Sequence, residues 1–151
     1  MRSRAGEILS TIILIVVILA IIIAIRDVLL TYTQVETPLV IVHGYSMYPY
    51  FLDGDIVLII SPEKAGIKPG DIVVYSSGKG YLIIHRVISI QGEGSPMITT
   101  KGDNNLLPDF PPTSLSRVKG VVASITLDCD LGEVKLVFKV PVLGGLLPIF
   151  G

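Results

Sequence analysis

Hydrophobic and polar positions are distributed unevenly along this chain, and a long apolar run stands near its N-terminus. Residues 8–25 contain no charged side chain, no proline and no glycine. Eighteen helical residues at ~1.5 Å each cover about 27 Å, close to the ~30 Å hydrocarbon core of a bilayer. Because a backbone in lipid must satisfy its own hydrogen bonds, the run predicts a transmembrane helix over residues 8–25.

This helix is expected to be an uncleaved anchor. A removable secretory signal also starts with basic residues, here Arg2 and Arg4. The apolar run is longer than a usual signal core, however, and no A-x-A cleavage site follows it. Only Arg26 follows the run before Lys64, so the positive-inside rule predicts residues 1–7 in the cytoplasm and the rest outside.

Beyond the anchor the pattern changes to short apolar runs separated by turn residues. All ten prolines and fourteen of the fifteen glycines lie beyond Thr37. Strand-length runs rich in β-branched residues cover 39–42, 55–60, 71–75, 81–90 and 118–127. The sequence therefore predicts a mainly β fold: a linker over 26–38, then a small, mostly antiparallel sheet or barrel-like domain over 39–151.

Two connecting segments have their own signatures. Residues 76–80, Ser-Ser-Gly-Lys-Gly, predict a hairpin loop between two of these strands. Residues 134–151 are apolar, but their prolines and glycines exclude a second membrane span. We expect this part to form an edge strand and then a segment at the membrane surface.

Composition narrows the classes of function. The 151 residues are 50% hydrophobic with a formal net charge of −1, which gives no field that would attract nucleic acid. A single cysteine, Cys129, excludes an intrachain disulfide, and with two histidines the chain has no cysteine- or histidine-rich metal site. We therefore expect no metal, no cofactor and no nucleic-acid partner.

One turn has the residues of a nucleophile site. Ser46 lies in Gly-Tyr-Ser-Met-Tyr-Pro, residues 44–49, between two predicted strands. A serine on a tight bend beside free backbone N–H groups meets the needs of a nucleophile and of an oxyanion site. Taken alone, the pattern is more often a simple turn.

A serine nucleophile needs a base, and the candidates are few. His85 lies inside a predicted strand, where a histidine is usually a hydrogen-bonded structural residue. His43 is only three residues before Ser46, too close along an extended chain for a reliable contact with the hydroxyl. Lys101 could act as a base only if it were buried and deprotonated. The loop that follows Lys101 carries Asp103 and Asp109, which alone would indicate a turn or a cation site.

Together these motifs resemble type I signal peptidases of the archaeal and endoplasmic-reticulum type. The motifs Ser-Met-Tyr-Pro, Gly-Asp-Ile-Val, His-Arg-Val and Gly-Asp-Asn-Asn follow one another in the order of that family over residues 39–109, with the anchor ahead of them. The resemblance implies Ser46 as nucleophile, His85 as general base and Asp109 as the residue that orients His85. Asp103 matches the loop aspartate that the family needs for its site.

The resemblance also implies a function. It indicates a membrane-bound serine endopeptidase that removes N-terminal signal peptides with small residues before the cut from exported preproteins. Such an enzyme works close to the translocon and to membrane lipid, and the resemblance leaves its partner subunits open. An exposed apolar rim is expected around the serine, formed by Tyr45, Met47, Tyr48, Tyr50 and Phe51.

Two positions depart from the family pattern. Many members carry a serine where this chain has Gly44, so the oxyanion here would depend on backbone N–H groups, with Ser46 and Gly44 as the candidates. Prolines surround Asp109, a setting that either buries it or passes its role to Asp103.

Three readings of function and two of location stay open. A Ser-Lys peptidase would lack the lysine expected where His85 stands, and a non-catalytic membrane-anchored β scaffold would have no need of Ser46, His85, Asp103 and Asp109 together. The short cytoplasmic segment favours an archaeal, stand-alone enzyme in the cell membrane. The alternative is an endoplasmic-reticulum enzyme with a lumenal catalytic domain.

Overall fold

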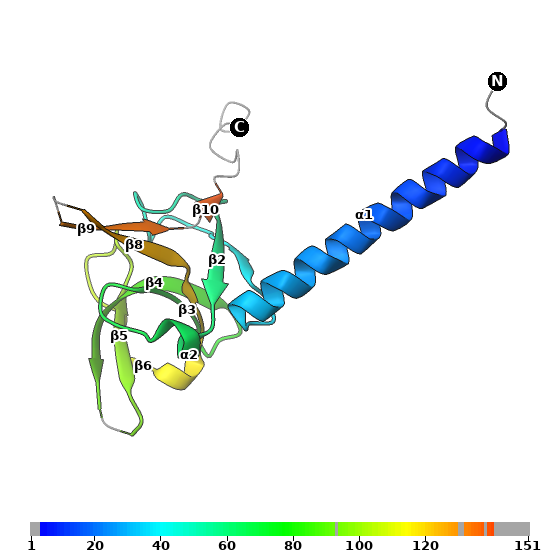
Figure 1. The fold of residues 1–151 in the computed structure, drawn as a ribbon. Coiled ribbons are helices and arrows are strands. Elements are labelled where there is room, and N and C mark those ends of the chain that lie inside the picture. Colours follow the sequence, from blue (N-terminus) through cyan, green and yellow to red (C-terminus); the bar gives the residue numbers. More distant parts are fainter. Residues whose placement is uncertain (1–3, 93, 130–131, 138, 141–151) are drawn as a thin grey trace, which may run out of the picture.

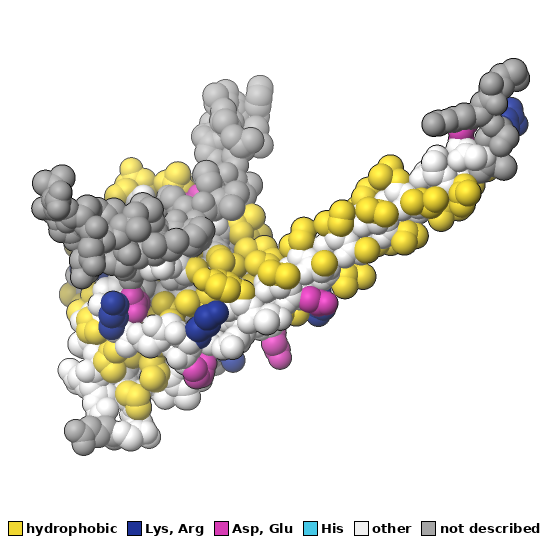
Figure 2. Space-filling view, in the orientation of Figure 1, with side chains coloured by type: hydrophobic (Ala, Val, Ile, Leu, Met, Phe, Trp, Pro, Cys, Tyr) yellow, Lys and Arg dark blue, Asp and Glu magenta, His cyan; other side chains and the backbone are white. Residues whose placement is uncertain are grey.

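The computed structural model describes residues 4–92, 94–129, 132–137 and 139–140, and it has an N-terminal helix that projects from a β domain (Figure 1). Helix α1 (Arg4–Thr33) contains a span from Gly6 to Thr33 that is long and apolar enough to cross a membrane. Hydrophobic side chains cover it along its length (Figure 2). The helix continues through most of the predicted linker because no glycine or proline interrupts residues 26–37.

The β domain is one curved antiparallel sheet with an additional hairpin (Figure 1). In the described chain, the sheet has the order β1-β2-β7-β3-β4-β5-β6, and β10 also pairs with β2. Strands β8 and β9 form the hairpin. The strands are β1 (Leu39–Ile41), β2 (Ile56–Ile60), β3 (Ile72–Ser76), β4 (Leu82–Gln91), β5 (Met97–Lys101), β6 (Thr113–Ser114), β7 (Val118–Val122), β8 (Ser124–Cys129), β9 (Gly132–Val137) and β10 (Lys139–Val140). Two short helices, α2 (Pro62–Ala65) and η1 (Leu115–Arg117), complete the fold.

The mainly β, antiparallel fold expected from the sequence is confirmed, with differences in detail. The run predicted as one strand over 118–127 is divided at Ala123, whose N–H donates to the carbonyl of Leu58 at 2.8 Å. Strand β5 was missed because its hydroxyl side chains, Thr99 and Thr100, hide the apolar alternation. Of the apolar C-terminal part predicted over residues 134–151, residues 138 and 141–151 lie outside the described residues.

Strand β3 is buried on both of its faces and divides the core. Ile72 and Val74 pack in one apolar cluster, together with Met47 and Phe51 from the segment after β1. Val73 belongs to a second cluster, which also contains Tyr75 of β3, Val87 of β4 and Ile98 of β5. Successive side chains of a strand point to opposite faces, so β3 alternates between the two clusters. The neighbouring strands are thereby held in register against it.

The end of α1 is joined directly to the β domain. Thr33 is fully buried, and its carbonyl accepts a hydrogen bond from the N–H of Ser61 at 2.8 Å. The ammonium of Lys64 in α2 donates to the carbonyl of Tyr32 and lies 3.9 Å from the centre of that ring. These contacts satisfy carbonyls at the helix C-terminus and place a positive charge at the negative end of its dipole.

Candidate active site

Neighbouring apolar side chains anchor the turn that carries Ser46 in the core of the β domain. Ser46 lies between β1 and β2, and the N–H of Phe51 donates to the carbonyl of Met47 at 2.9 Å. Met47 and Phe51 are 1% and 0% exposed, so the prediction that they belong to an exposed rim is wrong: their apolar side chains fill the core. Tyr45 and Tyr48 are exposed as expected, whereas Tyr50 is partly buried against the apolar core.

Gly44 gives this turn its backbone shape. Its φ of +87° lies in the region that side chains disfavour, and its N–H donates to Oδ1 of Asp53 at 2.8 Å. The same Oδ1 lies 3.5 Å from Nδ1 of His43, an exposed side chain. The N–H of Gly44 therefore already has an acceptor within the turn.

His85 lies on β4 with its ring directed toward the loop after β5. It is buried, and its register partner across the sheet is Val73. Nδ1 of His85 lies 2.6 Å from Oδ2 of Asp109. The N–H of Asp109 donates to the carbonyl of Thr100 at 2.8 Å, which fixes the backbone of Asp109 beside the end of β5.

Two more side chains reach the same carboxylate. The hydroxyls of Tyr75 and Thr100 lie 2.9 Å and 2.7 Å from Oδ2 of Asp109. Burial raises the pKa of Tyr75 to about 12; the neighbouring Asp109 adds to the rise, and the hydroxyl of Thr100 opposes it. Tyr75 therefore remains a protonated donor at neutral pH.

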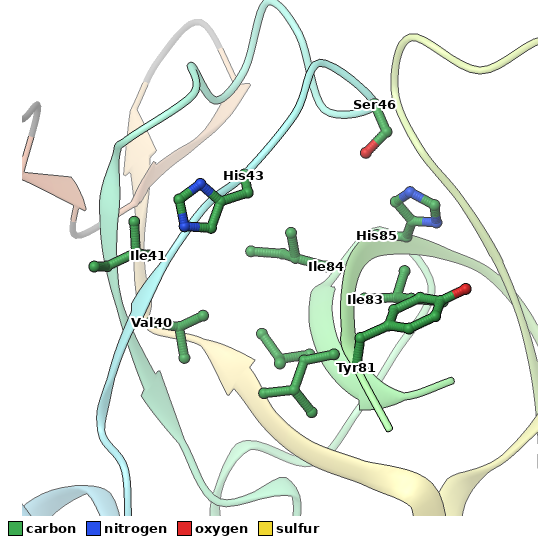
Figure 3. A pocket seen from close by; sticks show the side chains of 10 residues that line it. Val40, Ile41, His43, Ser46, Tyr81, Ile83, Ile84 and His85 are labelled. Carbon is green, nitrogen blue, oxygen red and sulfur yellow. The ribbon is translucent and has the colours of Figure 1, made fainter. Parts of the chain in front are cut away.

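Ser46 and His85 line one groove of about 640 Å³, which we call the Ser46 groove. Figure 3 shows their side chains next to each other at one end of it. Its other lining residues are mostly apolar: Val40, Ile41, His43, Val74, Tyr81, Leu82, Ile83 and Ile84. The groove thus offers an apolar surface that leads to a hydroxyl beside an imidazole.

Gly102 allows the serine turn and the histidine to approach each other. A Cβ atom on Gly102 would lie 2.6 Å from the carbonyl oxygen of Ser46 and 2.9 Å from Nε2 of His85. Both atoms therefore border the space that the missing side chain leaves. A backbone hydrogen bond also joins this loop to the serine turn: the N–H of Asn104 donates to the carbonyl of Ser46 at 2.8 Å.

Asp103 has a different partner from Asp109. It accepts two hydrogen bonds from Arg86, at 2.9 Å from Nε and 2.6 Å from Nη2. Arg86 also donates to the carbonyl of Gly70, and its hydrogen bond with Asp103 is the largest cause that raises the pKa of the guanidinium. Because Arg86 follows His85 in the strand, the two side chains point to opposite faces.

The structure thus places Ser46 and His85 at one groove and Asp109 against His85, whereas Asp103 pairs with Arg86. The contributions of Tyr75 and Thr100 were missed from the sequence. Tyr75 ends a predicted strand and Thr100 precedes the Lys-Gly-Asp-Asn-Asn segment, but no local pattern pairs either one with Asp109. Among the described residues, no three His, Cys, Asp or Glu side chains gather in a group that could hold a metal ion.

An antiparallel β domain with a serine and a histidine at one groove, and an aspartate hydrogen-bonded to that histidine, falls in the class of serine-peptidase domains. The chain belongs to the Peptidase S24-like family, whose model matches residues 20–117.

The individual relatives carry more specific names than the family model does. The chain is 40% identical over 77 residues to a signal peptidase complex catalytic subunit SEC11 from Clavispora lusitaniae, covering 50% of this chain and 46% of the relative. It is 37% identical over 84 residues to the human signal peptidase complex catalytic subunit SEC11C, covering 54% and 44%. The corresponding subunit of Dictyostelium discoideum is 38% identical over 84 residues, with 54% and 46% covered. The chain spans a little under half the length of these relatives.

Proposed function

We propose that this chain is a membrane-anchored serine endopeptidase that removes signal peptides from exported preproteins. The observation that carries the proposal is that Ser46 and His85, from separate segments, line one apolar groove, with Asp109 from a third segment hydrogen-bonded to His85. Similarity to signal peptidase catalytic subunits supports the substrate class.

In the proposed mechanism Ser46 is the nucleophile. Its Oγ attacks the scissile carbonyl while Nε2 of His85 takes the hydroxyl proton, and Asp109 stabilises the imidazolium through Nδ1. The proton then passes to the leaving amine as the C–N bond breaks, and water hydrolyses the acyl-enzyme by the same route. We assign oxyanion stabilisation to the N–H of Ser46, because the N–H of Gly44 is donated to Asp53.

The Ser46 groove supports an extended, largely apolar substrate. Val40 and Ile41 of β1 form one side, and Leu82, Ile83 and Ile84 of β4 contribute the other. We propose that a signal peptide with small residues before the cut lies between them. The groove has few charged groups, so apolar contact and backbone hydrogen bonds would supply the affinity.

The proposed location follows from α1 and from the charges at its ends. We propose that α1 spans the cell membrane once, with the N-terminus in the cytoplasm and the β domain outside. A lumenal domain in an endoplasmic-reticulum membrane is the alternative. The relatives are named as subunits of a signal peptidase complex, so partner subunits are a second part of this proposal.

The test uses the full chain in detergent or in vesicles, mixed with a preprotein that carries an apolar signal peptide. The wild type is expected to release the mature fragment, and Ser46→Ala and His85→Ala should each lower the rate at least ~100-fold. Ser95→Ala, an exposed serine outside the groove, is the matched control and should keep the wild-type rate. Wild-type cleavage by Ser46→Ala would contradict the proposed nucleophile.

A further inference from the structure

Three groups that can donate a hydrogen bond surround one oxygen of Asp109. Nδ1 of His85 lies 2.6 Å from Oδ2, the hydroxyl of Thr100 lies 2.7 Å away and the hydroxyl of Tyr75 lies 2.9 Å away. A carboxylate has acceptor capacity on both of its oxygens, so this concentration on one oxygen defines its direction closely. The two hydroxyls also lie 3.2 Å from each other.

The two hydroxyl donors are fixed by the core. Tyr75 is 2% exposed and Thr100 is 1% exposed. They come from β3 and β5, the two strands that flank β4, which carries His85. Tyr75 packs with Val73 and Val87 in the second apolar cluster, and Thr100 is the register partner of Val87, so neither hydroxyl can swing away without disturbing the sheet.

We propose that Tyr75 and Thr100 are positioning residues, which hold Oδ2 of Asp109 against Nδ1 of His85 and share its negative charge. This inference rests on the proposed function and names the groups that tune its base. A fixed Oδ2 selects the tautomer of His85 that carries its proton on Nδ1, which leaves Nε2 free to accept from Ser46.

The two hydroxyls also change how strongly the charge of Asp109 acts on His85. The carboxylate of Asp109 stabilises the protonated imidazole, and each hydroxyl that donates to Oδ2 weakens that stabilisation by spreading the charge. Removing one hydroxyl should therefore let His85 keep its proton to a higher pH. The titratable side chains that face this cluster are Asp109 and Tyr75 within it, Tyr81 near Tyr75, and His43 in the Ser46 groove.

The first measurement needs no turnover. The protonation of the His85 ring is followed by nitrogen NMR against pH in detergent micelles, in a His43→Gln background that leaves a single histidine. Tyr75→Phe and Thr100→Val should each move the midpoint to higher pH by about 0.5 unit. Thr100→Ser, which keeps the hydroxyl, and Thr99→Val, on the neighbouring position of β5, should leave it unchanged.

The second measurement is the cleavage of a preprotein by the same variants with His43 intact. Tyr75→Phe and Thr100→Val should lower kcat by ~10-fold with little change in KM, because neither residue is proposed to touch the substrate. The acid limb of the rate profile should move to higher pH with the NMR midpoint. Thr100→Ser should restore the wild-type values.

The outcomes separate this inference from the proposed function. A shifted NMR midpoint in a protein that cleaves no preprotein would support the positioning role and contradict the proposed function. Ser46-dependent cleavage with wild-type midpoints in Tyr75→Phe and Thr100→Val would overturn the inference. A lower melting temperature without any change of midpoint would also overturn it, because the two hydroxyls would then serve stability alone.

Discussion

At the scale of single residues, the proposed site depends on a side chain that is missing. Gly102 lies where the serine turn, the histidine and the amide of Asn105 meet. A methyl group there would lie closer than van der Waals contact to atoms from all three, and one of these atoms, Nε2 of His85, belongs to the proposed reaction. The loop can approach Ser46 only because this position is glycine.

We predict that Gly102→Ala lowers kcat/KM by at least ~100-fold, because the added Cβ must push the loop away from the carbonyl of Ser46 or rotate His85. The melting temperature should change little by comparison, since the position lies outside both apolar clusters. Cleavage kinetics and thermal unfolding of the same preparation measure the two effects. Wild-type turnover would show that Ser46 and His85 do not act across this gap.

The two loop aspartates should behave differently when each is changed to asparagine. Asp109→Asn should lower turnover by ~100-fold or more with a small effect on melting temperature, because it removes the charge facing His85. Asp103→Asn should lower the melting temperature and turnover together, since it weakens a two-point contact with Arg86 that holds the loop.

A double-mutant cycle gives the control for Asp103. Arg86→Gln should have a similar effect to Asp103→Asn, and the double variant should be little worse than either, because both remove the same contact. If Asp109→Asn were nearly active and Asp103→Asn were inactive but equally stable, the orienting role would pass to Asp103.

Tyr75 also predicts how stability depends on alkaline pH. Its pKa is raised to about 12 in the folded chain, above the ordinary value of 10. A raised pKa contributes stability that is complete below pH 10 and is lost as the pH rises toward 12. The urea midpoint of the wild type should therefore fall more steeply between pH 10 and 12 than that of Tyr75→Phe. Tyr45→Phe, at an exposed tyrosine that does not act on the pKa of Tyr75, should retain the wild-type slope.

At the scale of elements, the junction between α1 and the β domain relies on a few polar contacts. Ser61 serves twice: its N–H donates to Thr33, and its side chain caps α2 by accepting from the N–H of Lys64. Lys64 in turn reaches the last turn of α1. The short helix α2 therefore connects the long helix α1 to the sheet through these contacts.

We predict that Lys64→Met loosens this junction, at a cost of about 1 kcal/mol from the lost charge at the helix end and the lost contact with the ring of Tyr32. Amide hydrogen exchange at Thr33, Gln34 and Ser61 should become faster, while that of β3 stays slow. Lys68→Met, an exposed lysine in the next turn, is the matched control. Unchanged exchange in Lys64→Met would show that Thr33 and Ser61 hold the junction alone.

At the scale of the whole molecule, the sequence predicted what local patterns encode. The apolar run predicted the helix, and alternation between turn residues and β-branched runs predicted β1 to β4. Residues that meet only through the sheet were not predictable in this way. Tyr75, Thr100 and Asp109 converge because β3, β4 and β5 pair in a particular register, and register depends on the packing of Val73, Val87 and Ile98.

The burial of Thr33 has a consequence for how substrate and site meet. With α1 in a bilayer as proposed, a helix that enters the β domain without a flexible tether makes the groove rotate and diffuse in the plane as one body with its anchor. A preprotein held in the same bilayer then finds Ser46 by a search in two dimensions, at a fixed height. The shared membrane therefore restricts the orientation of enzyme and preprotein before they meet. This lowers the entropy cost of aligning them and raises the effective molarity of the scissile bond at the serine.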